Sequence, residues 1–334
     1  MKTDFTIIIS RTDALGDMVL TLPMAAFLKE SFPRCKVYFL ARKYTQPLIS
    51  LCRHIEGFID YDVLNGLPEA EQIACLQQYQ ADIFVNVLPK RSLASLAKKA
   101  GIPQRIGTFN RWYHWLSCNQ LIRLSRSRSD LHEAQLNFQL LRTLIKKVDL
   151  PAEIIPQYYA VTPPPFFDFG FIPKSDKSLI ILHPKSSGNG KEWGIENYNA
   201  LLGLLNPDTH QVVICGLPGE AEHIAPIFKN HPWVVDAIGR LSLTEYVSLI
   251  SRADALVASG TGPLHIAAMM GIKAIGLFPL RKDIGPGRWR PLGKQAVVLV
   301  AAETCGPCSA GNSCECISEI KPQRVANLLN YEYV

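Results

Sequence analysis

The sequence predicts an α/β protein built from two Rossmann-like domains that face each other across a cleft. Three observations carry this prediction. Short apolar runs typical of buried parallel strands alternate with helix-like segments along the chain. The chain has 334 residues, about twice the usual size of a single domain. A proline-rich stretch that includes Pro163, Pro164 and Pro165 separates two halves with the same alternation.

In the first half, a buried strand is expected at residues 6–10, followed by a polar turn at 11–16 and a helical stretch that reaches Pro33. Two more strands are expected at 37–40 and 83–88. A helix over residues 131–147 is expected to close this half, because its leucines recur at helical spacing.

In the second half, four apolar runs predict strands at 179–182, 212–215, 255–258 and 274–278. We therefore divide the chain into a first domain at 1–160, a linker at 161–175 and a second domain at 176–334.

The composition favours a compact protein, since 48% of the residues are hydrophobic and 19% are charged. No apolar run approaches the roughly 20 residues of a membrane helix. Asp4 and Arg11 interrupt the N-terminus before a signal-like segment develops. We expect a cytoplasmic protein.

Basic residues are concentrated in one segment. The net charge is +6, and residues 88–128 contain no Asp or Glu. This acid-free segment is a candidate surface for an anionic partner; the alternative is a set of solvated helix faces without specific recognition. Its cations are Lys90, Arg91, Lys98, Lys99, Arg105, Arg111, Arg123, Arg126 and Arg128.

Nine cysteines fall into two groups. Five are scattered through predicted strands and helices and are expected to be reduced core thiols: Cys35, Cys52, Cys75, Cys118 and Cys215. The other four, Cys305, Cys308, Cys314 and Cys316, have the spacing C-x2-C-x5-C-x-C. They could hold a structural zinc ion or form a redox-sensitive pair.

A strand-to-helix turn in the second half predicts a phosphate-binding site. Ser259, Gly260, Thr261 and Gly262 lie between a predicted strand and a helix that ends at Gly271. The first turn of such a helix has free backbone N–H groups, and small residues let an anion approach them. An ordinary tight turn is the alternative.

The loop after the first strand of the second half contains Ser186, Ser187 and Lys191. The lysine could neutralise a diphosphate, and the serines could donate hydrogen bonds to it. A surface loop without a ligand is the alternative.

At the first turn of the chain, Asp13 and Asp17 flank Gly16. Asp17 could cap the following helix or act as a general base. His132 and His265 are weak signals individually, because either could simply bind a backbone carbonyl. The chain lacks both the G-x-G-x-x-G turn after its first strand and the P-loop motif, which disfavours nicotinamide cofactors and P-loop NTPase activity.

Seven segments in order resemble glycosyltransferase family nine, the ADP-heptose:lipopolysaccharide heptosyltransferases. They span nearly the whole chain and are LGDMVLTLP at 15–23, RIG at 105–107, His132 before a leucine-rich helix, HP at 183–184 with KEW at 191–193, GLPGE at 216–220, SGTGPLHIA at 259–267 and the C-terminal cysteines.

This resemblance implies a GT-B fold and an inverting, metal-independent transfer of a heptose or related sugar from a nucleotide diphosphate, with ADP-heptose as the expected donor. The acceptor would be the anionic inner core of lipopolysaccharide, with no nucleic acid involved. No cofactor is implied. Contact with the cytoplasmic face of the inner membrane would be peripheral and electrostatic, since no hydrophobic anchor is obvious.

The resemblance also implies roles for individual residues. Asp17 is similar to the catalytic base, Lys191 to the diphosphate-binding lysine and Glu220 to the acid that contacts the ribose. The residues expected at the donor are Lys191, Ser186, Ser187, Glu220, Thr261, Gly262 and His265. Those expected at the acceptor are Lys90, Arg91, Arg105, Arg111 and His132.

Two positions depart from the family pattern. Gly260 stands where the family often has Asp, and Lys185 replaces a small residue after His-Pro. Two alternative functions stay open. A nucleotide-sugar epimerase can use the same two-domain architecture, and a non-catalytic nucleotide-sugar-binding protein of the same fold is favoured slightly by the missing Asp before Thr261.

Overall fold

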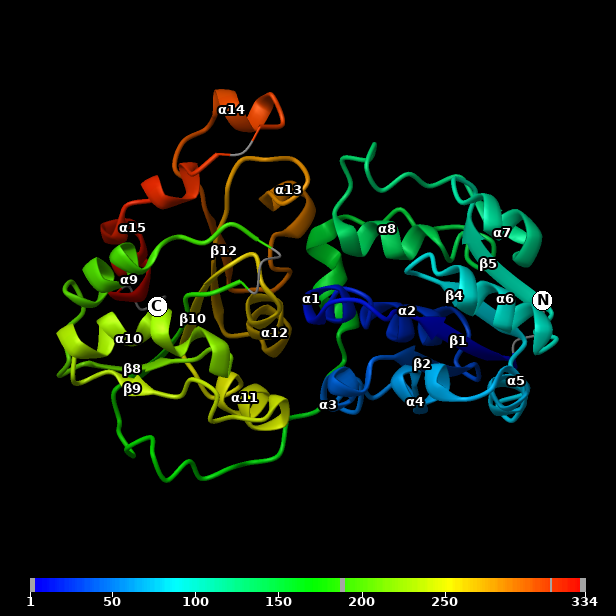
Figure 1. Ribbon diagram of the computed structural model, residues 1–334, viewed down its shortest axis with the longest axis horizontal. Helices are drawn as coiled ribbons and strands as arrows, with labels where there is room; N and C mark the ends of the chain where they lie inside the picture. Colours follow the sequence, from blue (N-terminus) through cyan, green and yellow to red (C-terminus); the bar gives the residue numbers. More distant parts are fainter. Residues whose placement is uncertain (1–3, 187–189, 313, 331–334) are drawn as a thin grey trace. The chain divides into compact units, whose positions relative to one another are not determined.

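The computed structural model describes residues 4–186, 190–312 and 314–330, which form two compact units, Met1–Thr162 and Pro163–Val334. Figure 1 shows both units coloured along the sequence.

The first unit contains a six-stranded parallel sheet with the strand order β3-β2-β1-β4-β5-β6. In the register of its central strands, Ile8 pairs with Tyr38 on one side and Phe84 on the other. The direction of winding reverses between β1 and β4, as in doubly wound folds. The strands are β1 Thr6–Ser10, β2 Lys36–Ala41, β3 Gly57–Asp60, β4 Ile83–Asn86, β5 Gln104–Thr108 and β6 Gln120–Ile122.

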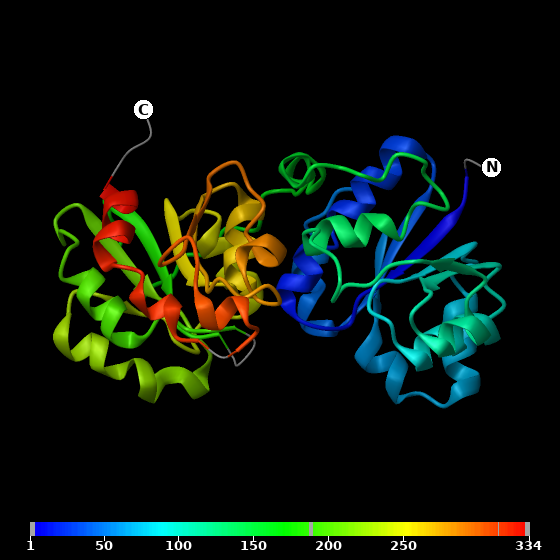
Figure 2. The same cartoon turned by 90° about the horizontal axis from the view of Figure 1, so that it is seen from above.

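Helices cover both faces of this sheet (Figures 1 and 2). One layer contains α2, α8 and the 3-10 segment η2, and the other contains α4 to α7. Apolar side chains such as Ile8, Phe84 and Leu93 pack between sheet and helices. The helices are α1 Leu15–Val19, α2 Pro23–Ser31, η1 Lys43–Thr45, α3 Gln46–Ile49, α4 Tyr61–Gly66, α5 Glu69–Gln77, α6 Arg91–Lys99, α7 Trp112–Ser117, α8 Glu133–Gln139 and η2 Ala152–Tyr158.

The second unit repeats this architecture with the strand order β12-β11-β10-β7-β8-β9, again entirely parallel. Winding reverses between β7 and β10. Numbered within each unit, both sheets have the order 3-2-1-4-5-6 of a Rossmann fold. The strands are β7 Ser178–His183, β8 His210–Ile214, β9 Val235–Asp236, β10 Ala255–Ser259, β11 Lys273–Leu277 and β12 Ala296–Leu299.

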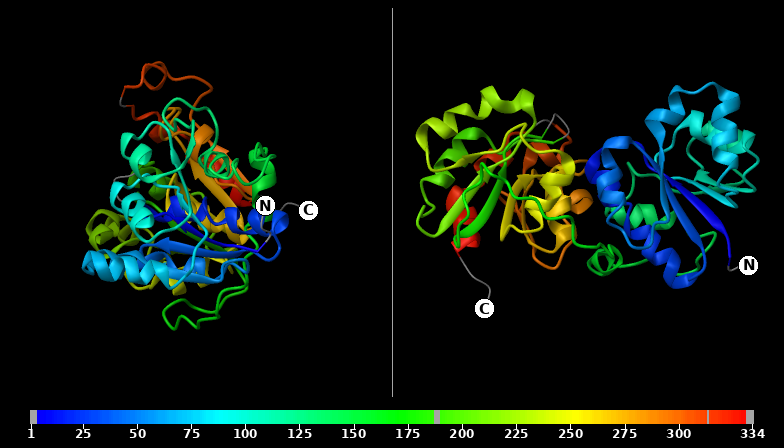
Figure 3. Two further views of the ribbon diagram at one scale, coloured as in Figure 1. Left: turned by 90° about the vertical axis from the view of Figure 1, so that its right-hand side faces the viewer. Right: turned by 90° about the horizontal axis from the view of Figure 1, so that it is seen from below.

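In this unit α9, α10 and α15 pack on one another, and α11 packs on α12; Figure 3 shows these layers from two further sides. Trp193, Tyr198 and Ile317 belong to its core. The helices are α9 Ile195–Leu202, η3 Pro218–Glu220, α10 Ala221–Asn230, α11 Leu243–Ile250, α12 Gly262–Met270, α13 Pro286–Trp289, α14 Gly306–Ser309, η4 Cys316–Glu319 and α15 Pro322–Asn330. None of the helices in the described part of the chain combines the length and apolar character that a bilayer span needs.

Two helix predictions need correction. The helical stretch expected up to Pro33 is two helices, and α1 begins at Leu15, inside the predicted turn. The break falls before Pro23, which has no N–H to donate within a helix. The helix expected over 131–147 ends at Gln139, because the chain tightens there into turns with i→i−3 hydrogen bonds. Leu136, Leu140, Leu141 and Leu144 are nevertheless buried, as the spacing predicted.

Candidate active site

In the first unit, the candidate site lies where the carboxyl ends of β1 and β4 meet, which is where open α/β sheets usually bind ligands. The segment from Arg11 to Ala14 leaves β1 and leads into α1, which carries Asp17 in its first turn. Ala14 is the N-cap residue and makes no side-chain cap. Asp17 does not cap the helix either, since its carboxylate is bound by a side chain.

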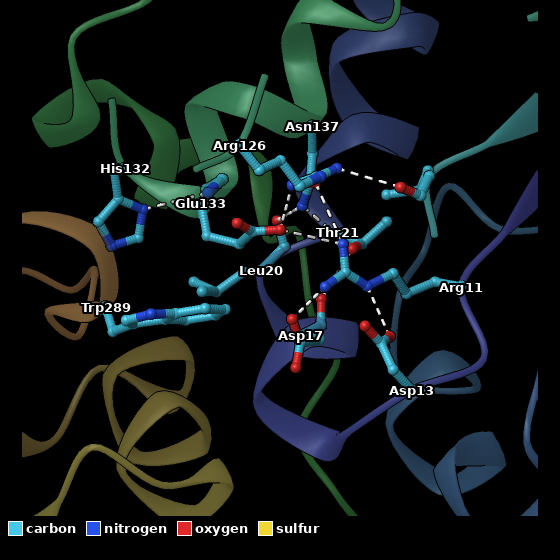
Figure 4. Close-up of polar contacts among 12 residues, drawn as sticks. Arg11, Asp13, Asp17, Leu20, Thr21, Arg126, His132, Glu133, Asn137 and Trp289 are labelled. Carbon is cyan, nitrogen blue, oxygen red and sulfur yellow. Dashed lines mark hydrogen bonds and ion pairs between the residues drawn. The ribbon is translucent and has the colours of Figure 1, made fainter. Parts of the chain in front are cut away.

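That side chain is Arg11, whose guanidinium is 3% exposed and holds carboxylates on three sides (Figure 4). It pairs with Asp13 at 2.6 Å, with Glu133 at 3.1 Å and with Oδ1 of Asp17. In the described part of the chain, Oδ2 of Asp17 has no hydrogen-bond partner. Arg11 therefore fixes the orientation of the Asp17 carboxylate and leaves one oxygen to accept a proton.

Residues of α8 and its approach complete this buried network. Glu133, 1% exposed, also pairs with Arg126. Asn137 accepts from Arg126 at 3.0 Å and donates to the carbonyl of Leu20 at 3.0 Å. Arg11, Glu133 and Asn137 were not among the site residues predicted from the sequence. A charged residue directly after a buried strand was a signal for Arg11, but its pairing with a residue 122 positions away is not visible in a sequence.

The network contains three carboxylates and two guanidinium groups, so full ionisation leaves one uncompensated negative charge. The pKa of Asp17 is raised to about 6. Burial is the largest cause; Arg11 opposes the shift, while the carboxylates of Asp13 and Glu133 add to it. A carboxylate with such a pKa is a stronger base than an exposed aspartate and is still mostly ionised at neutral pH.

In the second unit, the corresponding position is where β7 and β10 meet. The loop after β7 and the turn after β10 approach closely: a β-carbon on Gly190 would lie 3.4 Å from the carbonyl oxygen of Gly260. Thr261 is the N-cap residue of α12, and Gly271 ends that helix in the left-handed conformation, as predicted. The Thr261 hydroxyl oxygen is buried without a hydrogen-bond partner among the described residues. A buried, unsatisfied hydroxyl beside a free helix N-terminus is a suitable place for an anionic group.

Two consecutive residues, Glu192 and Trp193, anchor the β7 loop. Glu192 binds Lys185 at 2.6 Å and accepts from the backbone N–H of Ser186 at 3.1 Å. Trp193 is fully buried and donates from Nε1 to the carbonyl of Ile320 at 2.8 Å. Lys191, between the loop and these anchors, pairs with Glu315 at 2.6 Å. The anchors therefore fix the lysine at the carboxyl edge of β7. Glu192 balances the charge of Lys185, the residue that stands where the family has a small one.

Gly260, the other departure, has a steric explanation. A β-carbon there would lie 2.7 Å from the ring of Phe278, which is 1% exposed. An aspartate at this position would require the ring to move. The absent carboxylate is thus linked to the packing of Phe278.

The other donor candidates have different surroundings. The Ser186 hydroxyl donates to the carbonyl of Gly190 at 2.7 Å and so stabilises the loop itself. Glu220 accepts from the backbone N–H of Leu217 at 2.8 Å. His265 is 2% exposed on α12, whose first residue is Gly262. Ser187 lies outside the described residues.

His183, at the end of β7, is a structural residue. Burial lowers its pKa to about 4, so it is neutral at physiological pH. Its Nδ1 lies 3.1 Å from the hydroxyl of Tyr246.

The five acceptor candidates are not equivalent. Arg105 donates to the carbonyl of Ser117 at 2.7 Å and to that of Pro103 at 3.2 Å, so the fold uses its guanidinium. His132 is 1% exposed and accepts from the backbone N–H of Ala134 as the N-cap of α8. Lys90 lies 4.0 Å from the ring of Tyr61, and Arg91 lies 5.0 Å from that of Trp112. Arg111 is exposed at the start of α7.

The four C-terminal cysteines converge. Their sulfurs all lie within 4.8 Å of one another, with Cys305 and Cys314 at 3.3 Å and Cys308 and Cys316 at 3.6 Å. A disulfide requires about 2.05 Å, whereas thiolates around a tetrahedral zinc ion are about 3.8 Å apart. The cluster therefore fits a metal ion better than a disulfide pair. All nine cysteines are free; of the five scattered ones, four are buried and Cys75 is half-buried.

Comparisons with known proteins agree with this architecture. A family model described as glycosyltransferase family 9 (heptosyltransferase) matches residues 70–317. The chain is 26% identical over 287 residues to the lipopolysaccharide core heptosyltransferase OpsX of Haemophilus influenzae, covering 82% of this chain and 80% of that protein.

Two solved structures are similar over nearly their whole length. One is a family 9 glycosyl transferase from Veillonella parvula, with a TM-score of 0.78, 19% identity and 99% of each chain covered. The other is the ADP-heptose lipopolysaccharide heptosyltransferase II of Escherichia coli, with a TM-score of 0.77, 20% identity and 98% and 97% covered. These likenesses confirm the predicted fold class of two Rossmann-like domains.

Proposed function

The chain belongs to glycosyltransferase family 9 and is a glycosyltransferase, and from this premise we propose that it transfers a heptose from ADP-heptose to the inner core of lipopolysaccharide. The observation that carries the proposal is the Asp17 carboxylate, held by Arg11 at the carboxyl edge of the first sheet with its pKa raised to about 6. The similarity to the lipopolysaccharide core heptosyltransferase of H. influenzae and to the ADP-heptose lipopolysaccharide heptosyltransferase II of E. coli supports the choice of sugar and acceptor.

In the proposed reaction, Oδ2 of Asp17 takes the proton from an acceptor hydroxyl. The resulting oxygen nucleophile attacks the anomeric carbon of the donor, and the bond from that carbon to the diphosphate oxygen breaks on the opposite face. The configuration inverts, and the nucleoside diphosphate leaves with the bonding electron pair. General-base assistance of this kind typically contributes about 10²–10⁴-fold in rate.

The second unit would bind the leaving group. Lys191 and the backbone N–H groups at the start of α12 would stabilise the charge that develops on the diphosphate, without a metal ion at the reacting centre. The Thr261 hydroxyl would donate to a phosphate oxygen. Glu220 would bind the ribose, and Gly262 and His265 would line the phosphates. Lys191 pairs with Glu315 in this structure. The diphosphate would therefore either share the lysine with the Glu315 carboxylate or displace that carboxylate.

The first unit would bind the acceptor. Lys90, Arg91 and Arg111 are the cations best placed for an anionic core, since Arg105 and His132 make contacts within the fold. Residues 1–160 would thus form the acceptor domain and 176–334 the donor domain, with closure about Pro163–Pro165. Because the proposed acceptor is a lipid, we propose that the protein works at the cytoplasmic face of the inner membrane.

We also propose that Cys305, Cys308, Cys314 and Cys316 hold a zinc ion. Four protein thiolates would fill its coordination shell, so its role would be structural. Glu315 lies between two of these cysteines and pairs with Lys191. The ion would therefore order the segment that positions the donor-site lysine.

Mass spectrometry of the products tests the function directly. The protein would be offered ADP-heptose and other nucleotide sugars, each with truncated core acceptors, in buffer without added divalent ions. We expect the acceptor to gain the mass of one heptose as one ADP is released. Interconversion of nucleotide sugars without acceptor would instead indicate an epimerase, and the absence of any turnover would indicate a binding protein.

A further inference from the structure

Helix α7 exposes its apolar side chains and buries its polar ones. Trp112, Trp115 and Leu116 are 58%, 57% and 65% exposed, whereas His114 and Ser117 are buried. The exposed residues are spaced i, i+3 and i+4 and so share one face of the helix. This inverts the usual arrangement for a surface helix of a globular protein.

Buried contacts fix this orientation. Nδ1 of His114 accepts from the backbone N–H of Thr108 at 2.8 Å. Gly107 gives the helix room: a β-carbon there would lie 2.7 Å from both the His114 ring and the sulfur of Cys118. Rotating α7 to bury its tryptophans would break these contacts. The outward apolar face is therefore built into the fold.

The exposed aromatic side chains are themselves held in place. Nε1 of Trp115 donates to the carbonyl of Phe109 at 2.7 Å, and the two rings lie 5.1 Å apart. The Arg123 guanidinium lies 5.5 Å from the Phe109 ring, and that of Arg91 lies 5.0 Å from the Trp112 ring. Aromatic rings and cations thus alternate across one surface, which we call the α7 face. Its members are Arg91, Lys98, Phe109, Arg111, Trp112, Trp115, Leu116 and Arg123.

The charge of the α7 face indicates its partner. It lies in the acid-free segment 88–128, and α6 runs beside α7 with Lys98 bound to the carbonyl of Leu116 at 2.8 Å. A second copy of the chain would place the same cations against each other. An anionic bilayer is complementary, because tryptophan rings favour the headgroup level and each nearby cation gains from the surface potential.

We propose that the α7 face docks on the surface of an anionic phospholipid bilayer, with Trp112, Trp115 and Leu116 entering the headgroup region. This inference rests on the proposed function in one respect: a lipid acceptor gives the protein a reason to bind a membrane. Attachment would then be partly hydrophobic, unlike the purely electrostatic contact expected from the sequence. Residues 109–111 leave the carboxyl end of β5, the sheet edge from which Arg11 leaves β1, so docking would bring lipid to the edge that carries Asp17.

Sedimentation of the full chain with vesicles tests the proposal. We expect binding to vesicles of phosphatidylglycerol and phosphatidylethanolamine and little binding to phosphatidylcholine. The double variant Trp112→Ala, Trp115→Ala should weaken binding at least about tenfold. Arg123→Gln should weaken it about fivefold. Phe166→Ala is the matched control: this ring is 75% exposed with Arg252 4.5 Å from it, but it lies outside the α7 face, and its loss should change nothing.

Native-like binding by a folded double variant, with folding checked by circular dichroism, would overturn the proposal. If the native chain self-associates and the double variant loses this self-association while it still binds vesicles, the α7 face is a contact between copies and the proposal is also overturned. These vesicles contain no acceptor, so the result does not depend on turnover. Transfer to a soluble, deacylated acceptor should be unchanged in the double variant, whereas transfer to acceptor embedded in vesicles should fall. If the proposed function is wrong, neither acceptor is used while vesicle binding persists.

Discussion

At the scale of single residues, the proposed base depends on a buried arginine rather than on its own position in a helix. Arg11 binds one oxygen of Asp17 and leaves the other available. Burial and the carboxylates of Asp13 and Glu133 keep the proton affinity of Asp17 high. The arginine thus orients the base without suppressing its basicity.

This arrangement predicts the pH dependence of the reaction. Since the pKa of Asp17 is raised to about 6, kcat/KM should fall as the pH drops below about 6, where the carboxylate becomes protonated. Asp13→Asn removes a neighbouring negative charge, which should move this acid limb to lower pH. Initial rates measured from pH 4.5 to 8 give the acid limb of the native protein and that of the Asp13→Asn variant. An acid limb near 4 in the native protein would mean that Asp17 is not the base.

The donor-site lysine gives a second residue-level prediction. Lys191→Gln should raise the KM for the donor about 10- to 100-fold, because a charge-assisted contact to the diphosphate is lost. Lys177→Gln is a suitable control. It is the same change in the same unit, but Lys177 lies at the amino end of β7 and binds the carbonyl of Pro207. Equal effects of the two substitutions would contradict the role of Lys191.

At the scale of secondary structure elements, the sequence identified the central strands and missed the edges. Every apolar run that we assigned to a strand is one: β1, β2, β4, β7, β8, β10 and β11. The four edge strands β3, β6, β9 and β12 were missed, together with β5. The edge strands β3, β6 and β9 are short and partly exposed, and they lack the continuous apolar runs of strands buried on both faces. The edge strand β12 is the apolar run AVVL, which we did not assign to a strand. In β5, Gln104 and Arg105 begin a strand that is only half apolar.

The site was predictable only in part for a related reason. Asp17, Lys191 and Thr261 stand at strand-to-helix connections, which a sequence reveals. Arg11, which holds Asp17, is in turn bound by Glu133 of α8, 122 positions away in the sequence. Likewise, the outward orientation of α7 depends on the packing of His114 against Gly107. The hydrophobic periodicity of the sequence does not reveal this contact.

The C-terminal cysteine segment gives a prediction at this scale. Cys308→Ser should reduce the metal content of the purified chain from about one zinc ion to none, as measured by inductively coupled plasma mass spectrometry. Donor affinity should fall as well, because Glu315 loses its fixed position beside Lys191. Cys75→Ser, which changes a thiol outside the cluster, should alter neither quantity. A native chain without bound metal would contradict the proposed zinc site.

At the scale of the whole molecule, two copies of one architecture carry different chemistry. Both sheets have the same strand order, and in each the candidate residues lie where the winding reverses. One reversal point has a buried, negatively charged network. The other has a lysine, a helix N-terminus and a hydroxyl group that has no hydrogen-bond partner among the described residues. One unit thus suits proton removal and the other suits binding of an anion, as glycosyl transfer from a nucleotide diphosphate requires.

This division predicts that catalysis and donor binding can be separated by one substitution in the first unit. Asp17→Asn keeps the size of the side chain and removes its ability to take a proton. Turnover number and donor affinity, the latter from calorimetry with ADP-heptose, should be measured on the same preparation. We predict a fall in kcat of about 10²–10⁴-fold with donor affinity nearly unchanged. Undiminished turnover by the variant would contradict the assignment of Asp17 as the base.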